Sequence, residues 1–344
     1  MKIAIATDAW RPQTNGVVQT LSTTAEKLHA LGHETCVIEP NQFRTLPCPT
    51  YPEIRLAVLP YRRVAFLLDA FAADAVHIAT EGPIGAAARR WCVRHAMPFT
   101  TSYHTQFPEY LRARAPVPLA MTYAHLRRFH GAATRTMVAT PTMQQLLEAR
   151  GFRNIVRWTR GVNVELFRPR AKSFLMLPRP IAMYVGRVAV EKNIEAFLRL
   201  DVPGTKVVVG DGPARKHLQA HYPRAVFTGF KYGDALAAHL AAADVFVFPS
   251  LTDTFGLVLL EALSCGVPVA AFPVTGPIDV VENGRTGVLH DDLRLATLQA
   301  LELNPTVCRE FALRHTWDAA TSQFVANLAS RSAVVQTVSA LQAV

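Results

Sequence analysis

The chain has 344 residues, half of them hydrophobic, so it is long enough to bury two separate cores. Its five cysteines are odd in number, scattered and without a CxxC pair, which argues against a disulfide framework or a zinc site and favours a reducing, cytoplasmic setting. The net charge of +10 arises in residues 1–172, where 22 lysines and arginines face 11 acidic residues, against 14 and 15 in residues 173–344. Without interleaved aromatic residues or a recognition motif, this excess favours an anionic membrane surface and ranks nucleic acid lowest.

Short, nearly continuous apolar runs alternate with helical patterns along the chain. Such runs are typical of parallel strands buried on both faces, so the sequence predicts an α/β protein built from βα units. No stretch of about 18 apolar residues is free of charge, so we expect no membrane span, and any membrane association should be peripheral. The expected strands are residues 2–7, 34–39, 75–78, 99–103, 137–140, 181–185, 206–209, 225–228, 245–248 and 268–272.

The pattern breaks near Phe167, and Pro178 and Pro180 precede a fresh strand. We therefore expect one Rossmann-like domain over residues 1–170, joined by a C-terminal crossover helix at about 316–332, and a second over residues 171–315. Doubly wound sheets of this kind bind ligands at the carboxyl ends of their strands.

Two motifs of the first half follow expected strands. Asn15 and Gly16 lie in a loop that leads into a helix, and the missing side chain of Gly16 would let a phosphate or an acceptor approach the backbone. His104 follows the strand at residues 99–103. A lone histidine is more often a structural residue, but one at the carboxyl end of a strand is as often functional, so its role stays open on the residues alone.

Two cations follow the first strand of the second half. The string Gly186-Arg187 is followed five residues later by Lys192. A departing nucleoside diphosphate needs its developing charge neutralised, and Arg187 as a fork and Lys192 as a point charge can do this without a metal. The alternative is a solvated lysine at a helix start, where the helix dipole disfavours a cation.

Glycine-containing turns follow the next two expected strands. They contain Gly210 and Gly212, and then Gly229 and Phe230. On the residues alone the first can be a simple turn. It is not a GxGxxG string, which argues against a dinucleotide oxidoreductase.

The most informative string runs from Pro249 to Pro268, where a buried strand leads through a polar turn into an apolar helix. The start of that helix offers free N–H groups to a diphosphate. Asp253 and Glu261 lie about 12 Å apart along a helix axis, which exceeds the ~6.5–9.5 Å of a hydrolase pair and indicates that they hold different parts of one long ligand. The alternative is that Asp253 is an N-cap and Glu261 a solvated residue.

The same string resembles the Glu-x7-Glu motif of retaining GT-B glycosyltransferases of the family 4 type, with Asp253 at the first acidic position as in mannosyl and sulfoquinovosyl lipid transferases. The resemblance covers essentially the whole chain. It implies that Asp253 contacts the donor hexose, that Glu261 holds the ribose, and that His104 lies near the sugar. Asn163, where the family has an aspartate, is assigned to structure. The other donor-binding residues it implies are Gly16, Gly186, Gly210, Gly212, Gly229, Phe230, Thr254, Phe255, Gly256 and Leu257.

These observations together predict a metal-independent enzyme that moves a hexose from a UDP- or GDP-sugar to a hydroxyl acceptor, with Arg187, Lys192, Asp253 and His104 as its catalytic residues and no cofactor. Retention is implied by the resemblance. The expected acceptor is a membrane lipid and the expected location is the cytoplasm, on the inner face of the cytoplasmic membrane. The alternatives are a soluble or polysaccharide acceptor, a nucleotide-sugar epimerase, and a non-catalytic protein that binds sugar nucleotides.

The basic first half also predicts a membrane-docking surface, in which cations and apolar residues lie together. The alternative is a solvated arginine face over a buried apolar core. The residues expected to form the surface are Arg89, Arg90, Trp91, Arg94, Arg112, Arg114, Arg127, Arg128, Arg135 and the segment 116–123 with Leu119, Met121 and Tyr123.

Overall fold

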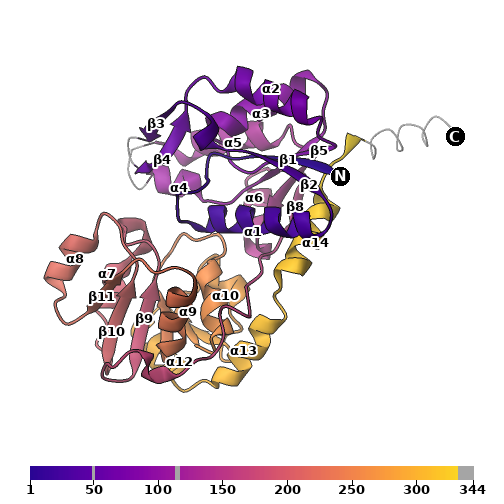
Figure 1. Ribbon diagram of the computed structural model, residues 1–344. Helices are drawn as coiled ribbons and strands as arrows, with labels where there is room; N and C mark the ends of the chain where they lie inside the picture. Colours follow the sequence, from indigo (N-terminus) through magenta and orange to yellow (C-terminus); the bar gives the residue numbers. More distant parts are fainter. Residues whose placement is uncertain (49–50, 113–116, 332–344) are drawn as a thin grey trace. The chain divides into compact units, whose positions relative to one another are not determined.

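The structure is a computed structural model that describes residues 1–48, 51–112 and 117–331 and divides into two compact units (Figure 1). Unit 1 contains residues 1–159 and the chain from Asp318 onward, and unit 2 contains Arg160–Trp317. The division falls ahead of the expected boundary after residue 170. The reason is that this segment is bonded to unit 2, where Phe167 O accepts from Ser264 Oγ at 2.6 Å and Arg170 pairs with Asp234 at 2.7 Å.

The described part of unit 1 is built on a six-stranded parallel sheet with the strand order β2-β1-β5-β6-β7-β8. Its strands have few exposed positions, as the continuous apolar runs predict: β5 and β6 are buried throughout. The strands are β1 (Lys2–Ala6), β2 (Glu34–Ile38), β5 (Ala75–Ile78), β6 (Phe99–Ser102), β7 (Arg135–Val138) and β8 (Ile155–Arg157), with a separate antiparallel pair β3 (Thr45–Cys48) and β4 (Tyr51–Ala57).

Three apolar clusters are buried in the described part of unit 1. One contains Ile3 and Ile5 of β1 together with Trp158 and Phe324, and a second contains the alternate β1 residues Ala4 and Ala6 with side chains of helices 61–71 and 83–94. The third surrounds Tyr103 and Tyr123. The helices are α1 (Gly16–Ala30), α2 (Tyr61–Phe71), α3 (Pro83–Arg94), α4 (Phe107–Arg112), α5 (Leu119–His130), α6 (Pro141–Ala149) and α14 (Trp317–Asn327), with a 3-10 turn η1 (Pro40–Gln42).

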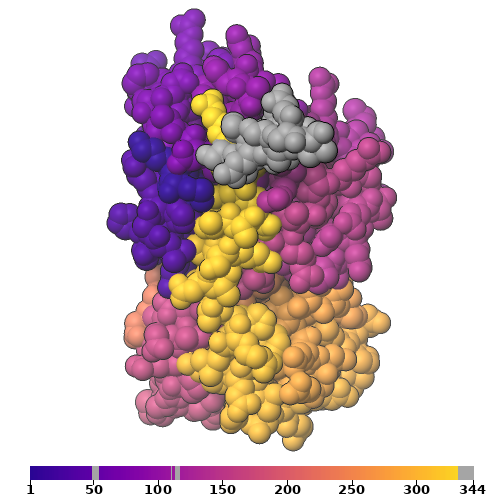
Figure 2. All heavy atoms as spheres, turned by 90° about the vertical axis from the view of Figure 1, so that its right-hand side faces the viewer, coloured from indigo at the N-terminus to yellow at the C-terminus, as the bar shows by residue number. Residues whose placement is uncertain are grey.

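The C-terminal helix α14 returns to unit 1. Trp158 Nε1 donates to Ala320 O at 3.1 Å, and Lys27 of α1 pairs with Asp318 at 2.8 Å. The space-filling view shows this helix, in yellow, against the indigo N-terminal residues (Figure 2). The helix therefore completes the apolar core that contains Trp158 and Phe324.

Unit 2, all of whose residues are described, contains a second six-stranded parallel sheet with the order β11-β10-β9-β12-β13-β14. The predicted α/β class is thus confirmed. The strands are β9 (Ile181–Val185), β10 (Thr205–Val209), β11 (Val226–Gly229), β12 (Val245–Phe248), β13 (Val269–Ala271) and β14 (Gly287–Leu289). The helices are α7 (Ile194–Leu198), α8 (Arg215–His221), α9 (Gly233–Ala242), α10 (Leu257–Ser264), α11 (Pro277–Val280), α12 (Leu293–Ala300) and α13 (Pro305–Leu313), with 3-10 turns η2 (Lys172–Phe174) and η3 (Val190–Lys192).

Candidate active site

Four neighbouring strands of unit 2, in the order β11-β10-β9-β12, end at one edge of the sheet because they are parallel. The loops that follow them carry most of the predicted site. The structure therefore brings to this edge Gly186, Arg187, Lys192, Gly210, Gly212, Gly229, Phe230, Asp253, Thr254, Phe255, Gly256 and Leu257.

The glycine-containing loops at this edge are joined by backbone hydrogen bonds. Gly186 N donates to Val209 O, and Gly210 N donates to Gly229 O, both at 3.0 Å. A Cβ on Gly210, which has a φ of 149°, would lie 1.8 Å from Gly186 O. The loop after β10 is thus more than a simple turn, because only glycine permits this approach of two backbones.

Lys192 and Asp253, from loops after different strands, form an ion pair. Lys192 Nζ lies 2.6 Å from Asp253 Oδ1, and the two side chains are only 20% and 18% exposed. Asn193, next in the chain, adopts the left-handed conformation with a φ of 50° and donates from Nδ2 to Pro249 O at 3.1 Å. The loop after β9 that carries Lys192 and Asn193, the cation loop, is therefore tied to the end of β12, beside the Asp253 carboxylate.

Three polar atoms after β12 are buried without a hydrogen-bond partner among the described residues: Ser250 Oγ, Thr252 Oγ1 and Asp253 Oδ2. Leaving a buried polar group unsatisfied costs about 1–3 kcal/mol, so such a cluster suits a ligand that supplies the missing partners. Sequence reasoning did not assign Ser250. The available signal was its position directly after a strand that ends at the ligand-binding edge.

Glu261 lies on α10, whose N-cap is Gly256 with a φ of 82° and no side-chain cap. The first amides of the helix are thus open to a ligand. Burial raises the pKa of the Glu261 carboxyl to about 7. That carboxyl can lose its desolvation cost by accepting hydrogen bonds from hydroxyl groups of a ligand.

The raised pKa of Glu261 predicts a pH-dependent effect of Glu261→Gln on the ligand-free protein. In the unfolded chain this carboxyl ionises near its ordinary pKa of 4.5, whereas in the folded protein it ionises near 7. Wild type therefore loses stability as pH rises between these values, and glutamine does not. We expect the variant to be more stable by about 1–3 kcal/mol at pH 8, and by little at pH 5.

Urea denaturation at both pH values measures this difference, and titration with UDP and GDP should show nucleotide binding weakened about tenfold. Equal stability of the variant and wild type at pH 8 would contradict the assignment of Glu261 as a desolvated carboxylate.

Gly16 and His104 belong to unit 1 and so are not part of the group in unit 2. Gly16 begins α1, where Asn15 Oδ1 caps the helix by accepting from Val17 N and Val18 N at 3.0 Å. His104 follows β6, and its ring lies against Trp158 with 5.8 Å between centroids. Both stand at the carboxyl edge of the unit 1 sheet.

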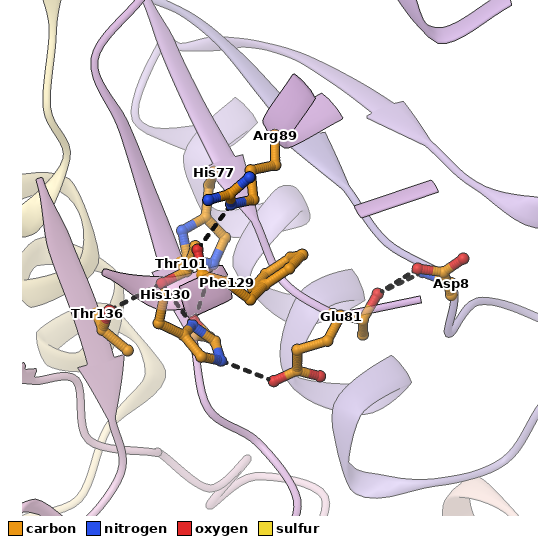
Figure 3. A network of polar contacts seen from close by, with 10 residues as sticks. Asp8, His77, Glu81, Arg89, Thr101, Phe129, His130 and Thr136 are labelled. Carbon is orange, nitrogen blue, oxygen red and sulfur yellow. Dashed lines mark hydrogen bonds and ion pairs between the residues drawn. The ribbon is translucent and has the colours of Figure 1, made fainter. Parts of the chain in front are cut away.

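A polar network at the same edge of unit 1 was not predicted (Figure 3). His130 Nε2 lies 3.1 Å from Glu81 Oε1, and its Nδ1 lies 2.9 Å from Thr101 Oγ1. Asp8 accepts from Ile84 N at 2.9 Å at the start of α3, and burial raises the pKa of its carboxyl. These residues come from separate segments, so no sequence motif indicated them.

Asn163 has the structural role expected of it, since its Oδ1 accepts from Leu166 N at 3.0 Å and from Glu165 N at 3.2 Å. In the described ranges no group of three histidine, cysteine or acidic residues is arranged to hold a metal ion. Nor does any helix of those ranges have the length and apolar character needed to cross a bilayer.

The predicted docking surface is wrong in several of its residues. Trp91 is 6% exposed and donates from Nε1 to Asp69 at 3.1 Å, and Tyr123 is buried with its hydroxyl 2.5 Å from Glu109. Arg89 and Arg135 bind backbone carbonyls. Aromatic residues with a polar tip are buried here because the tip finds a partner. Of the remaining members, Met121 is exposed, and Arg114 and Pro116 lie outside the described residues.

Two family models match the chain, one described as Glycosyltransferase Family 4 over residues 14–166 and one described as Glycosyl transferases group 1 over residues 179–302. A GDP-mannose-dependent alpha-mannosyltransferase of Mycobacterium tuberculosis is 33% identical over 316 residues, which are 84% of this chain and 83% of that protein. The chain belongs to glycosyltransferase family 4. The predicted family and enzyme class are thereby confirmed.

Two further similarities extend over nearly the whole chain. An alpha-monoglucosyldiacylglycerol synthase of Streptococcus pneumoniae is 24% identical over 352 residues, covering 89% of this chain and 79% of that protein. The solved structure of sucrose-phosphate synthase from Thermosynechococcus elongatus matches with a TM-score of 0.74 at 21% identity, covering 98% of this chain and 99% of that one. At that identity the structural match establishes the fold, which is GT-B.

Proposed function

We propose that this glycosyltransferase moves a hexose from a UDP- or GDP-sugar to a hydroxyl of a membrane lipid, with retention of configuration. The observation that carries the proposal is the pairing of Lys192 with Asp253 at the shared edge of β9 and β12. It places a cation suited to a diphosphate beside a carboxylate suited to sugar hydroxyls. We assign most of the donor-binding residues to unit 2 and acceptor binding to unit 1.

In this proposal Arg187, Lys192 and the first amides of α10 neutralise the departing diphosphate. Asp253 accepts from hexose hydroxyls, and Glu261 accepts from the ribose. Gly16 and His104 keep the donor-binding and catalytic roles that the family resemblance implies. The donor pocket is lined by Gly186, Gly210, Gly212, Gly229, Phe230, Thr254, Phe255, Gly256 and Leu257.

The chemical step is a substitution on one face of the sugar. The acceptor oxygen bonds to the anomeric carbon while the bond to the diphosphate oxygen breaks, and the diphosphate takes the proton of the acceptor hydroxyl. No carboxylate nucleophile is needed. The fixed cations stabilise the charge that grows on the leaving oxygen, so their largest contribution comes in the transition state.

Transfer should persist in EDTA, because two fixed cations and the helix amides take the place of a divalent ion. The measurement is the rate of nucleoside diphosphate release from UDP-glucose and from GDP-mannose, with a lipid acceptor, before and after chelation. A rate that EDTA abolishes and magnesium restores would overturn the proposal of metal-independent transfer.

The proposed lipid acceptor is supported by two observations: the basic excess of the first half and the likeness to an enzyme named for diacylglycerol.

A revised docking surface, the α2–α3 patch, combines exposed apolar side chains with cations of two helices in contact. Arg63 lies over Phe66, and Arg90 and Arg94 lie over Tyr61. The exposed residues that we assign to this patch are Leu59, Arg63, Phe66, Arg90, Val93 and Arg94.

We expect the protein to co-sediment with anionic vesicles but not with neutral ones, and to be released by salt, because each exposed cation contributes about 1 kcal/mol near anionic lipid. Replacing Leu59 and Phe66 by serine should weaken this binding. The control is Met176→Ser, since Met176 is 95% exposed, close to the 91% of Leu59, but lies in unit 2. No binding to either vesicle, together with efficient glycosylation of a soluble sugar, would assign the acceptor to the soluble class.

A further inference from the structure

The Lys192 ammonium interacts with Asp253 in the ligand-free chain and, in the proposed function, with the diphosphate of the donor. In the ligand-free chain its ammonium is hydrogen-bonded to Asp253 at 2.6 Å, in a site where both side chains are largely shielded from water. In the proposed function the same ammonium neutralises the donor's diphosphate. The Asp253 carboxylate and the diphosphate are both anionic, so they repel each other and compete for the same ammonium. When the diphosphate binds Lys192, Asp253 therefore needs another hydrogen-bond partner.

The Asp253 carboxylate can accept further hydrogen bonds besides the one from Lys192. Its Oδ2 is buried without a hydrogen-bond partner among the described residues, and so is the neighbouring Thr252 Oγ1. The hydroxyl groups of a donor hexose can supply the missing hydrogen bonds. A nucleoside diphosphate that has lost its sugar cannot.

The backbone of the cation loop is held by hydrogen bonds that do not involve the ion pair. The backbone of Lys192 is held by its N–H bond to Ala189 O at 3.1 Å, and the side chain of Asn193 ties the loop to Pro249. An exchange of partners therefore needs only the flexible side chains of Lys192 and Asp253 to move.

We propose that Asp253 exchanges hydrogen-bond partners during each turnover, an inference that rests on the proposed function. With the complete donor bound, Asp253 accepts from the hexose and Lys192 is released to the diphosphate. Once the hexose has been transferred, Asp253 takes Lys192 back and weakens the hold on the product. The ion pair thus favours the nucleotide sugar over the free nucleoside diphosphate and promotes product release.

The test is a double-mutant cycle on nucleotide affinity, with UDP and GDP titrated calorimetrically into wild type, Asp253→Asn, Lys192→Ala and the double variant. Asparagine keeps the size of the side chain and removes its charge. We expect Asp253→Asn to bind the nucleoside diphosphate about tenfold more tightly than wild type, since a hydrogen bond between charged groups no longer has to be broken. In the Lys192→Ala background the same change should alter affinity less than about twofold.

The cycle separates the exchange from general repulsion between the carboxylate and the nucleotide. Equal tightening by Asp253→Asn in both backgrounds would mean repulsion alone and would overturn the exchange. No tightening by Asp253→Asn in the protein that retains Lys192 would overturn it as well. If Lys192→Ala itself leaves nucleotide affinity unchanged, the assignment of Lys192 to the diphosphate fails as well. If Lys192→Ala weakens nucleotide binding but Asp253→Asn does not tighten it, the exchange is overturned and the proposed function still holds.

Discussion

Lys192→Ala is expected to lower turnover by about 10²-fold or more, because the lost interaction is strongest as the diphosphate departs. The variant also leaves the Asp253 carboxylate without its cation in a largely shielded site, so its melting temperature should fall. Steady-state rates of nucleoside diphosphate release and thermal denaturation measure the two effects.

Two further variants separate catalysis from stability. The double variant Lys192→Ala with Asp253→Asn should regain melting temperature but not turnover, because the uncompensated charge is gone while the cation is still missing. Lys216→Ala, which removes an exposed lysine of unit 2, should behave as wild type. Turnover of Lys192→Ala within a few-fold of wild type would refute the leaving-group assignment.

Gly210→Ala should have the largest effect on stability. The new Cβ would meet Gly186 O at 1.8 Å, and the φ of 149° is one that residues with a side chain rarely adopt. Backbone strain and overpacking together predict a loss of about 3 kcal/mol or more, with the loops after β9 and β10 forced apart. Nucleotide binding should be lost along with it, since both loops belong to the proposed donor pocket.

Gly284→Ala is the matched control in the same unit. Gly284 also has a positive φ, of 76°, but a Cβ added there would have no neighbouring atom within 4 Å. Its cost should be the backbone strain alone, about 1 kcal/mol. Urea denaturation of both variants measures the contrast, and similar losses for the two would argue against close packing of the donor loops.

Most strands could be predicted because a strand buried on both faces needs a continuous apolar run, and β9 and β12 have one. The hairpin β3–β4 could not, since β3 is short, contains Pro47 and has two exposed residues. Strands β8 and β14 have three residues each and are not buried throughout, whereas β13, of the same length, is buried throughout and was predicted.

The site was predictable where it depends on local sequence, because loops that follow parallel strands meet at one edge. What could not be predicted is which loops touch. The Lys192–Asp253 pair depends on β9 and β12 being neighbours, and strand order is not encoded in any one motif. The burial of Trp91 and Tyr123 depends in the same way on distant partners, Asp69 and Glu109.

The most direct test of the central claim is to incubate the purified protein with diacylglycerol in anionic vesicles and with UDP-glucose or GDP-mannose, and to determine the anomeric configuration of the product by NMR. We expect nucleoside diphosphate release from one of these α-configured donors, an α-linked glycolipid, and loss of both in Lys192→Ala. A β-linked product, or donor turnover that Lys192→Ala leaves intact, would contradict it.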